Sequence, residues 1–211
     1  MGLVIILSLM SPFIAAVSGE VAGSRVLAER LIDLAGMDRG LCAVLGADGD
    51  LALQIVKRSN LLVHLRDSER SVVNAQRRLA EEAGIGINRL VIEQGPLTRL
   101  PYADNMVDVI ITTRMQGDTM TQPPLSEVLR VLRPDGIAVI GAAEEGGTQM
   151  LRRWARGGNV GEVKIWQDDH GSWLRFAKPA MEGIDEWTHW EHRPDNNPLS
   201  TDEAIKAPYL T

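Results

Sequence analysis

The chain has 211 residues, of which 45% are hydrophobic and 24% charged, which is enough for one medium-sized domain with its own core and a short appendage. The formal net charge of −6 disfavours a nucleic-acid partner, because an acidic surface repels phosphate backbones. A single cysteine, Cys42, excludes an internal disulfide and a cysteine-based zinc site.

The chain opens with an almost unbroken apolar run over residues 3–17. The run is too short for an ordinary membrane span, and the small residues Ala16 and Ser18 fit a signal-peptidase site. Because no Lys or Arg precedes the run and Pro12 interrupts it, two alternatives stay open: a mispredicted start of the chain, or a short buried segment. We predict a signal peptide over residues 1–18 and therefore an exported protein, periplasmic or extracellular; without the signal, the expected location is the cytoplasm. No later stretch is apolar enough to span a membrane.

Helical and strand-like patterns alternate through the rest of the chain. Apolar residues at helical spacing predict helices over residues 20–35, 50–58, 68–83, 126–133 and 147–156. Short apolar runs bounded by turn residues predict strands over residues 41–45, 61–65, 89–93, 107–112 and 137–141. Two further segments, 162–167 and 172–178, flank Asp168-Asp169-His170-Gly171, which is a hairpin signal. Strands that alternate with helices predict an α/β fold with a parallel, doubly wound sheet.

Two segments of the chain carry recognisable motifs: LPYADNMVDVI, residues 100–110, and EVLRVLRPDG, residues 127–136. They resemble the segments "LPF-x-D-x-x-F-D-x-V" and "E-x-x-R-V-L-K-P-G-G" of class I S-adenosylmethionine (SAM)-dependent methyltransferases. The resemblance covers about residues 21–178. It implies a Rossmann-like, mostly parallel seven-stranded sheet with a C-terminal antiparallel hairpin, SAM as cofactor and a small-molecule acceptor. It also implies that Asp108 anchors loop geometry.

The family binds SAM at a G-x-G-x-G loop after the first strand, where glycines let backbone N–H groups approach the ligand. Here the loop is Gly46-Ala47-Asp48-Gly49-Asp50, which keeps the first glycine and has carboxylates at the second and third positions. Three interpretations stay open: the carboxylates hold the positive groups of SAM, they crowd the pocket, or the loop is a plain turn whose Asp48 or Asp50 caps the next helix.

Asp67 ends the second predicted strand, where the resemblance implies an acidic residue that accepts hydrogen bonds from both ribose hydroxyls. It also fits a cap for the helix that starts at Ser68, and the two roles are compatible. After the third strand, Pro96 and Leu97 stand where the family has Asp-Ala, so they offer an adenine only shape and apolar contact. Thr112 lies at the expected pocket mouth or is an ordinary strand-end residue. The implied cofactor-binding set is therefore Gly46, Ala47, Asp48, Gly49, Asp67, Ser68, Pro96, Leu97 and Thr112.

No catalytic residue is predicted, because methyl transfer needs mainly proximity and alignment. His64 lies inside an apolar strand and is interpreted as a hydrogen-bonded core histidine rather than a base. By the same argument, Cys42 is interpreted as a small buried hydrophobe.

The residues after Pro179 form a tail. Residues 183–190 and 195–198 resemble the linker between a methyltransferase-like domain and a PQQ-type β-propeller in some bacterial exported proteins. The resemblance implies an adjacent propeller domain or partner that Trp187 and Trp190 contact. The acidic and histidine residues nearby are interpreted as part of this linker, and no metal site is predicted; they are Asp185, Glu186, His189, Glu191 and His192.

The predicted organisation is a signal peptide over 1–18, a methyltransferase-like Rossmann domain over 19–179 and a linker over 180–211. The first functional hypothesis is a SAM-dependent methyltransferase of unknown acceptor with a degenerate cofactor loop. The alternative is a non-catalytic docking or structural module of an exported propeller protein, since SAM is made in the cytoplasm and an exported enzyme lacks its donor. Binding of another nucleotide or nucleoside is a third, weaker hypothesis.

Overall fold

The computed structural model describes residues 12–46, 50–115, 122–143, 145–158, 160–183, 199 and 203, with side chains from residue 23 onward. The chain divides into two compact units, Met1–Lys178 and Pro179–Thr211, and every helix and strand described below belongs to the first. The helices are α1 (Pro12–Ala35), α2 (Leu51–Arg58), α3 (Arg70–Glu82), α4 (Leu125–Val131) and α5 (Gly147–Trp154). The strands are β1 (Arg39–Leu45), β2 (Asn60–Asp67), β3 (Leu90–Gln94), β4 (Val107–Thr112), β5 (Leu132–Ala142), β6 (Val163–Asp168) and β7 (Gly171–Ala177).

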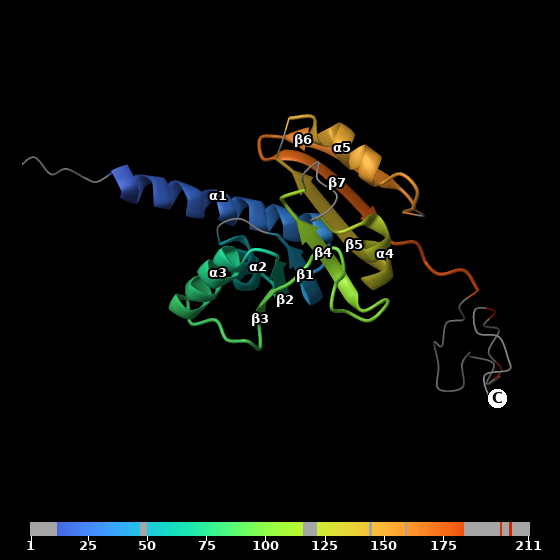
Figure 1. Ribbon diagram of the computed structural model, residues 1–211, viewed down its shortest axis with the longest axis horizontal. Coiled ribbons are helices and arrows are strands. Elements are labelled where there is room, and N and C mark those ends of the chain that lie inside the picture. The colour runs from blue at the N-terminus through green and yellow to red at the C-terminus, as the bar shows by residue number, and fades with distance from the viewer. Residues whose placement is uncertain are drawn as a thin grey trace, which may run out of the picture. The chain divides into compact units, whose positions relative to one another are not determined.

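The strands form one mixed sheet in the order β3-β2-β1-β4-β5-β7-β6 (Figure 1). The first five strands are parallel, and β7 pairs antiparallel with both β5 and β6. The predicted α/β class, the doubly wound parallel sheet and the closing hairpin are therefore confirmed. The strand order reverses direction beside β1 and β4, and ligands of such sheets bind at the carboxyl ends of the strands there.

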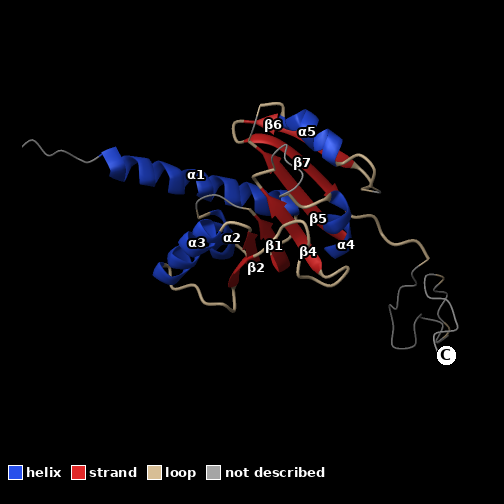
Figure 2. Cartoon of the chain, in the orientation of Figure 1, coloured by secondary structure: helices blue, strands red, loops and turns tan. Residues whose placement is uncertain are grey.

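Helices cover both faces of the sheet (Figure 2). Buried residues of α1, α2 and α3 form one core with alternate residues of the strands, and the largest side chain in it is Trp173 of β7. Buried residues of α4, α5 and the segment after β3 form the second core, with Phe176 of β7. Aromatic residues of β7 thus belong to the cores on both faces of the sheet.

Trp173 reaches its place because Gly141 faces it without a side chain. A Cβ at Gly141 would lie 2.5 Å from Trp173 Cζ3, closer than any real contact. The Trp173 indole N–H donates to Asp168 Oδ1 at 3.2 Å, so the polar edge of this buried ring is also satisfied. A glycine in β5 therefore makes room for the largest residue of the core.

Two local details go beyond the predicted ranges. The buried face of α3 is centred on Val73, Gln76 and Ala80, and Val72 is only half-buried. Residues 133–136 form an irregularity within β5: Val107 pairs with Leu132 but Val109 pairs with Ile137, so residues 133–136 bulge from the ladder.

The first helix begins earlier than predicted. It starts at Pro12 rather than at residue 20, so the second half of the N-terminal apolar run is helical. Residues 1–11 lie outside the described part of the chain, and the signal peptide stays a prediction.

Candidate functional site

Three of the predicted cofactor residues come together at the carboxyl ends of β1, β2 and β3. Gly46 follows β1 with a φ of +57°, a conformation that favours glycine. A Cβ placed on Gly46 would lie 3.6 Å from Leu97 Cδ1 and 3.8 Å from Asp67 Oδ2. The side of Gly46 that lacks a Cβ therefore faces one apolar group and one carboxylate. An apolar group suits the base of a nucleoside, and a carboxylate suits its ribose hydroxyls.

Asp67 is buried, with 4% of its surface exposed. Its Oδ1 accepts the Glu69 backbone N–H at 2.7 Å, so it supports the entry to α3 although the residue directly before the helix is Glu69. The predicted cap by Asp67 is therefore wrong, because α3 begins at Arg70 and no side-chain hydrogen bond caps it, although Asp67 holds the backbone just before the helix. Its Oδ2 is the oxygen that points toward Gly46. One oxygen of the Asp67 carboxylate thus accepts a backbone hydrogen bond, and the other faces the candidate site.

The remaining members of the predicted set differ in position. Pro96 is exposed, and its carbonyl accepts the Arg66 Nε–H at 3.1 Å; Ser68 is exposed, and its carbonyl accepts from Gln94 at 3.2 Å. Thr112 is buried at the end of β4, with 1% exposed. Ala47, Asp48 and Gly49 lie outside the described residues, while Asp50 precedes α2 and accepts the side-chain N–H of Gln54 instead of capping the helix.

Arg114, just after β4, is a site residue that sequence reasoning missed. Its Nη1 lies 3.9 Å from Asp67 Oδ2, the oxygen that faces Gly46. Nothing in the sequence pattern connects two residues so far apart in the chain, since the proximity arises from the β2-β1-β4 strand order. The candidate site therefore has an acidic and a basic group side by side.

The two sequence segments that carried the resemblance hold each other. Glu127 accepts the Leu100 backbone N–H at 2.6 Å, and Arg130 donates to the carbonyls of Leu100 at 3.1 Å and Tyr102 at 2.8 Å. Arg130 also pairs with Glu127 at 2.7 Å, and this bond is the main reason that the pKa of Glu127 is lowered. We call these contacts of Glu127 and Arg130 with Leu100 and Tyr102 the clasp. The clasp fixes the segment after β3, which contributes Leu97 to the site.

His64 is a hydrogen-bonded, half-buried histidine, as predicted. Its Nδ1 lies 2.9 Å from the Tyr102 hydroxyl, and its Nε2 lies 3.3 Å from Glu93 Oε2 without hydrogen-bond geometry. Burial lowers the pKa of His64 below its ordinary value, against the opposing pull of Glu93. Burial therefore disfavours the protonated form of His64.

Cys42 and Asp108 behave as interpreted from the sequence. Cys42 is fully buried in β1, and burial raises the pKa of its thiol to about 12, so it is a packing residue. Asp108 accepts the Leu41 backbone N–H at 2.7 Å and the Arg133 Nε–H at 2.6 Å. It lies at the start of β4, so it ties the ends of strands opposite to the candidate site.

Two classes of site are not found in the described part of the chain. None of its helices is both long enough and apolar enough to cross a lipid bilayer. Nor do three or more His, Cys, Asp or Glu side chains gather there in an arrangement suited to a metal ion. The tail residues Trp187 and Trp190, and the acidic and histidine cluster beside them, lie outside the described residues.

Comparison with known proteins supports the resemblance found in the sequence. Residues 45–140 match the family model described as "Methyltransferase domain". No curated protein matches the chain significantly. The matched segment begins at the last residue of β1 and ends in β5, so it contains Gly46, Asp67, Leu97 and Arg114.

Solved structures share the fold. A candidate S-adenosyl-L-methionine-dependent methyltransferase from Methanococcus maripaludis has a TM-score of 0.61 at 18% identity, over 87% of this chain and 100% of its own. A SAM-dependent methyltransferase from Aquifex aeolicus has a TM-score of 0.58 at 15% identity, over 71% of this chain and 88% of its own. The [4+2]-cyclase SpnF has a TM-score of 0.60 at 18% identity, over 74% of this chain and 81% of its own. At these identities the likeness establishes the fold alone. The chain therefore has the Rossmann-like fold of these structures, and its residues 45–140 are similar to the methyltransferase family model.

Proposed function

We propose that this domain binds S-adenosylmethionine and transfers its methyl group to a small-molecule acceptor. The observation that carries the proposal is the buried Asp67 carboxylate, whose Oδ2 faces the side-chain-free position of Gly46 at the carboxyl edge of the sheet. The methyltransferase family match over residues 45–140 supports it.

Asp67, Leu97 and Gly46 have the chemistry needed to bind the ribose and the base of SAM. Ribose hydroxyls donate to a carboxylate, and Asp67 presents one oxygen toward the site while the other stays engaged with the backbone of Glu69. Leu97 supplies an apolar contact for the base, and Gly46 removes the Cβ that would occupy the intervening space. Bound SAM supplies a methyl group on a positively charged sulfur, and the role of the chain is to orient it and to exclude water.

The residues proposed to contact the adenine, Pro96 and Leu97, offer it no specific hydrogen bond. Pro96 has no N–H to donate, and its carbonyl already accepts from Arg66 at 3.1 Å. We therefore expect the adenine to be held by shape and apolar contact with Leu97, with weak discrimination among purines. The residues Ala47, Asp48, Gly49, Ser68 and Thr112 complete the proposed binding set.

The test is a calorimetric titration of SAM into the full-length chain, with two matched variants. Asp67→Asn removes the charge but keeps an oxygen for the Glu69 N–H, and Asp33→Asn makes the same change at an exposed position of α1. Hydrogen bonds to a charged group contribute about 1.5–3 kcal/mol, so Asp67→Asn should weaken SAM by about ten-fold or more, and Asp33→Asn should leave it unchanged. Failure of the folded wild-type chain to bind millimolar SAM would refute the proposal.

A second candidate is a non-catalytic module, and one observation favours it. Arg114 lies 3.9 Å from Asp67 Oδ2, so a ribose must compete with a guanidinium for that oxygen. The fold also occurs in a protein that is described as a cyclase. An Arg114→Gln variant separates the possibilities: SAM binding that appears only in this variant means that Arg114 closes the site, whereas no binding in either protein favours a docking role.

The predicted export of the protein and its predicted propeller partner are both parts of the second candidate function. A signal peptide over residues 1–18 and docking through Trp187 and Trp190 stay predictions. N-terminal sequencing of the protein made in cells tests the first, because cleavage after Ser18 leaves Gly19 as the new N-terminus. An exported protein would favour the docking role, since SAM is made in the cytoplasm.

A further inference from the structure

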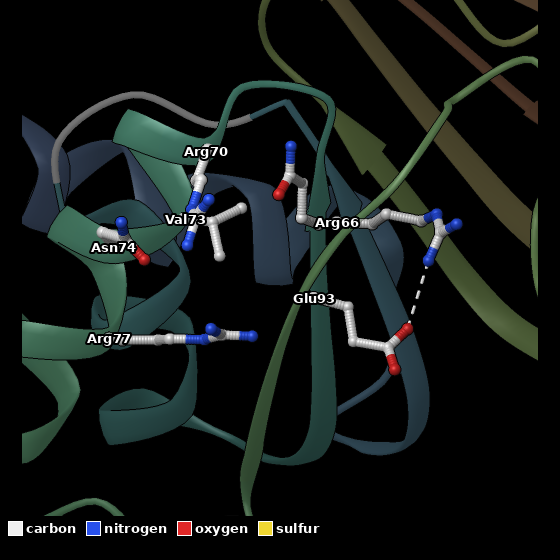
Figure 3. A pocket seen from close by; sticks show the side chains of 7 residues that line it. Arg66, Arg70, Val73, Asn74, Arg77 and Glu93 are labelled. Carbon is white, nitrogen blue, oxygen red and sulfur yellow. Dashed lines mark hydrogen bonds and ion pairs between the residues drawn. The ribbon is translucent and has the colours of Figure 1, made fainter.

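We propose that the groove between α3 and the edge strand β3 binds the phosphate group of a small phosphorylated molecule. The inference goes beyond the proposed function, because SAM carries no phosphate. The hollow has a volume of about 540 Å³ and is lined by Arg66, Arg70, Val73, Asn74, Arg77, Glu93 and Gln94 (Figure 3). Asp67, the proposed ribose ligand, is not part of this lining.

The charges of the lining favour an anion. The lining contains three arginines and one carboxylate, and this carboxylate, Glu93, is already paired with Arg66 at 3.1 Å; both side chains point away from α3 (Figure 3). On the α3 side, Arg70 and Arg77 therefore have no carboxylate partner within the described residues. The whole chain has a net charge of −6, so this groove is a local exception to an acidic molecule.

The helix spaces the donors along one face. Arg70, Asn74 and Arg77 are separated by four and three residues, so their side chains leave α3 on the same side. Arg77 is fixed in place because its Nε and Nη2 donate to the Ile92 carbonyl at 3.2 and 2.8 Å. These two bonds hold the Arg77 guanidinium at the groove and leave its Nη1 group to donate to a ligand. Arg70 also lines the groove, and its side chain is exposed.

The chemistry of these donors selects the ligand class. Guanidinium groups bind phosphate oxygens by paired N–H bonds, and the amides of Asn74 and Gln94 add neutral donors. Val73 is the single apolar side chain of the lining, so an apolar ligand finds little surface. A hollow of about 540 Å³ exceeds the size of a phosphate ion, which leaves room for the body of a small ester.

The experiment is a calorimetric titration of inorganic phosphate into the full-length chain at constant ionic strength, balanced with chloride. The variant is Arg70→Gln, and its matched control is Arg78→Gln, which removes the same charge from the same helix outside the lining. We expect phosphate to bind and Arg70→Gln to weaken it by about five-fold or more, because a fork of two N–H donors is lost. Arg78→Gln should bind as the wild type does.

Two results overturn the proposal. One is no binding heat at about 20 mM phosphate from a chain that circular dichroism shows to be folded. The other is an equal loss in both arginine variants, which would mean that general surface charge and not the groove attracts the anion. The SAM titration is independent of both, because Arg70 does not contact the Gly46 and Asp67 site.

A parallel titration with glycerol 3-phosphate distinguishes the source of the phosphate. Tighter binding of the ester than of inorganic phosphate, with the same dependence on Arg70, supports a phosphorylated metabolite. Binding of inorganic phosphate with exclusion of the ester overturns the ester part of the proposal and leaves a site for the free ion.

Discussion

Replacing Gly46 by alanine tests the candidate cofactor site most directly. The φ of +57° costs an alanine about 1–2 kcal/mol, because a Cβ crowds the neighbouring carbonyl in this conformation. The new methyl group meets Leu97 Cδ1 at 3.6 Å and Asp67 Oδ2 at 3.8 Å, which are ordinary contacts, so no steric clash is added. At about 2–4 °C per kcal/mol, the melting temperature should fall by about 2–8 °C.

The effect on ligand binding should be much larger than the effect on stability. The methyl group stands between the carboxylate proposed for the ribose and the apolar wall proposed for the base, so SAM affinity should fall by about ten-fold or more. Gly84→Ala is the matched control: its φ is +66°, and nothing lies within 4 Å of the added Cβ. It should lose similar stability and keep SAM binding. Equal SAM affinity in Gly46→Ala and Gly84→Ala would refute the assignment of this site.

Three further predictions concern the framework around the site. Arg130→Ala removes the donors to the Leu100 and Tyr102 carbonyls and should lower the free energy of unfolding in urea by about 2 kcal/mol. It should also speed proteolytic cleavage after β3, and an unchanged cleavage rate would contradict the role given to the clasp. Gly141→Ala places a Cβ 2.5 Å from Trp173 and should cost about 1–3 kcal/mol; a urea midpoint equal to that of the wild type would contradict the contact. Because burial lowers the pKa of His64 below 6.5, the unfolded chain takes up this proton first as the pH falls. Stability from neutral His64 is thus full above pH 6.5 and declines below it, and His64→Gln should flatten the urea midpoint between about pH 7 and 5; an unchanged slope would contradict this.

The fold was predictable because local patterns and tertiary structure agree. Buried parallel strands appear in the sequence as continuous apolar runs, and each predicted strand overlaps the observed one, as 107–112 does with β4. The Glu127 and Arg130 pair was visible as part of a motif, although its role in holding residues 100–102 appeared only in the structure. Sequence patterning therefore predicted the order and approximate positions of the elements, whereas the contacts between them appeared only in the structure.

The parts of the site that escaped prediction depend on proximity across the sheet. Arg114 and Asp67 are 47 positions apart, and no periodic signal joins them. On α3, helical periodicity over residues 68–83 predicts the helix but does not reveal that Arg77 lies beside the edge strand β3. The proximity of Gly46 and Asp67 follows from their places in the sequence, because Gly46 directly follows β1, Asp67 ends β2, and the carboxyl ends of neighbouring parallel strands lie at the same edge of the sheet.

The contact between Arg77 and Ile92 has a consequence for the solubility of the protein. β3 is an edge strand, and an unpaired carbonyl on such an edge is a template for the strand of another molecule. Two N–H groups of Arg77 occupy the Ile92 carbonyl, so an incoming strand must displace a charged side chain before it can pair. At the opposite edge, β6 carries Lys164 at one of its two exposed positions. A cationic side chain thus lies on each edge strand, and charged edges of this kind disfavour edge-to-edge aggregation.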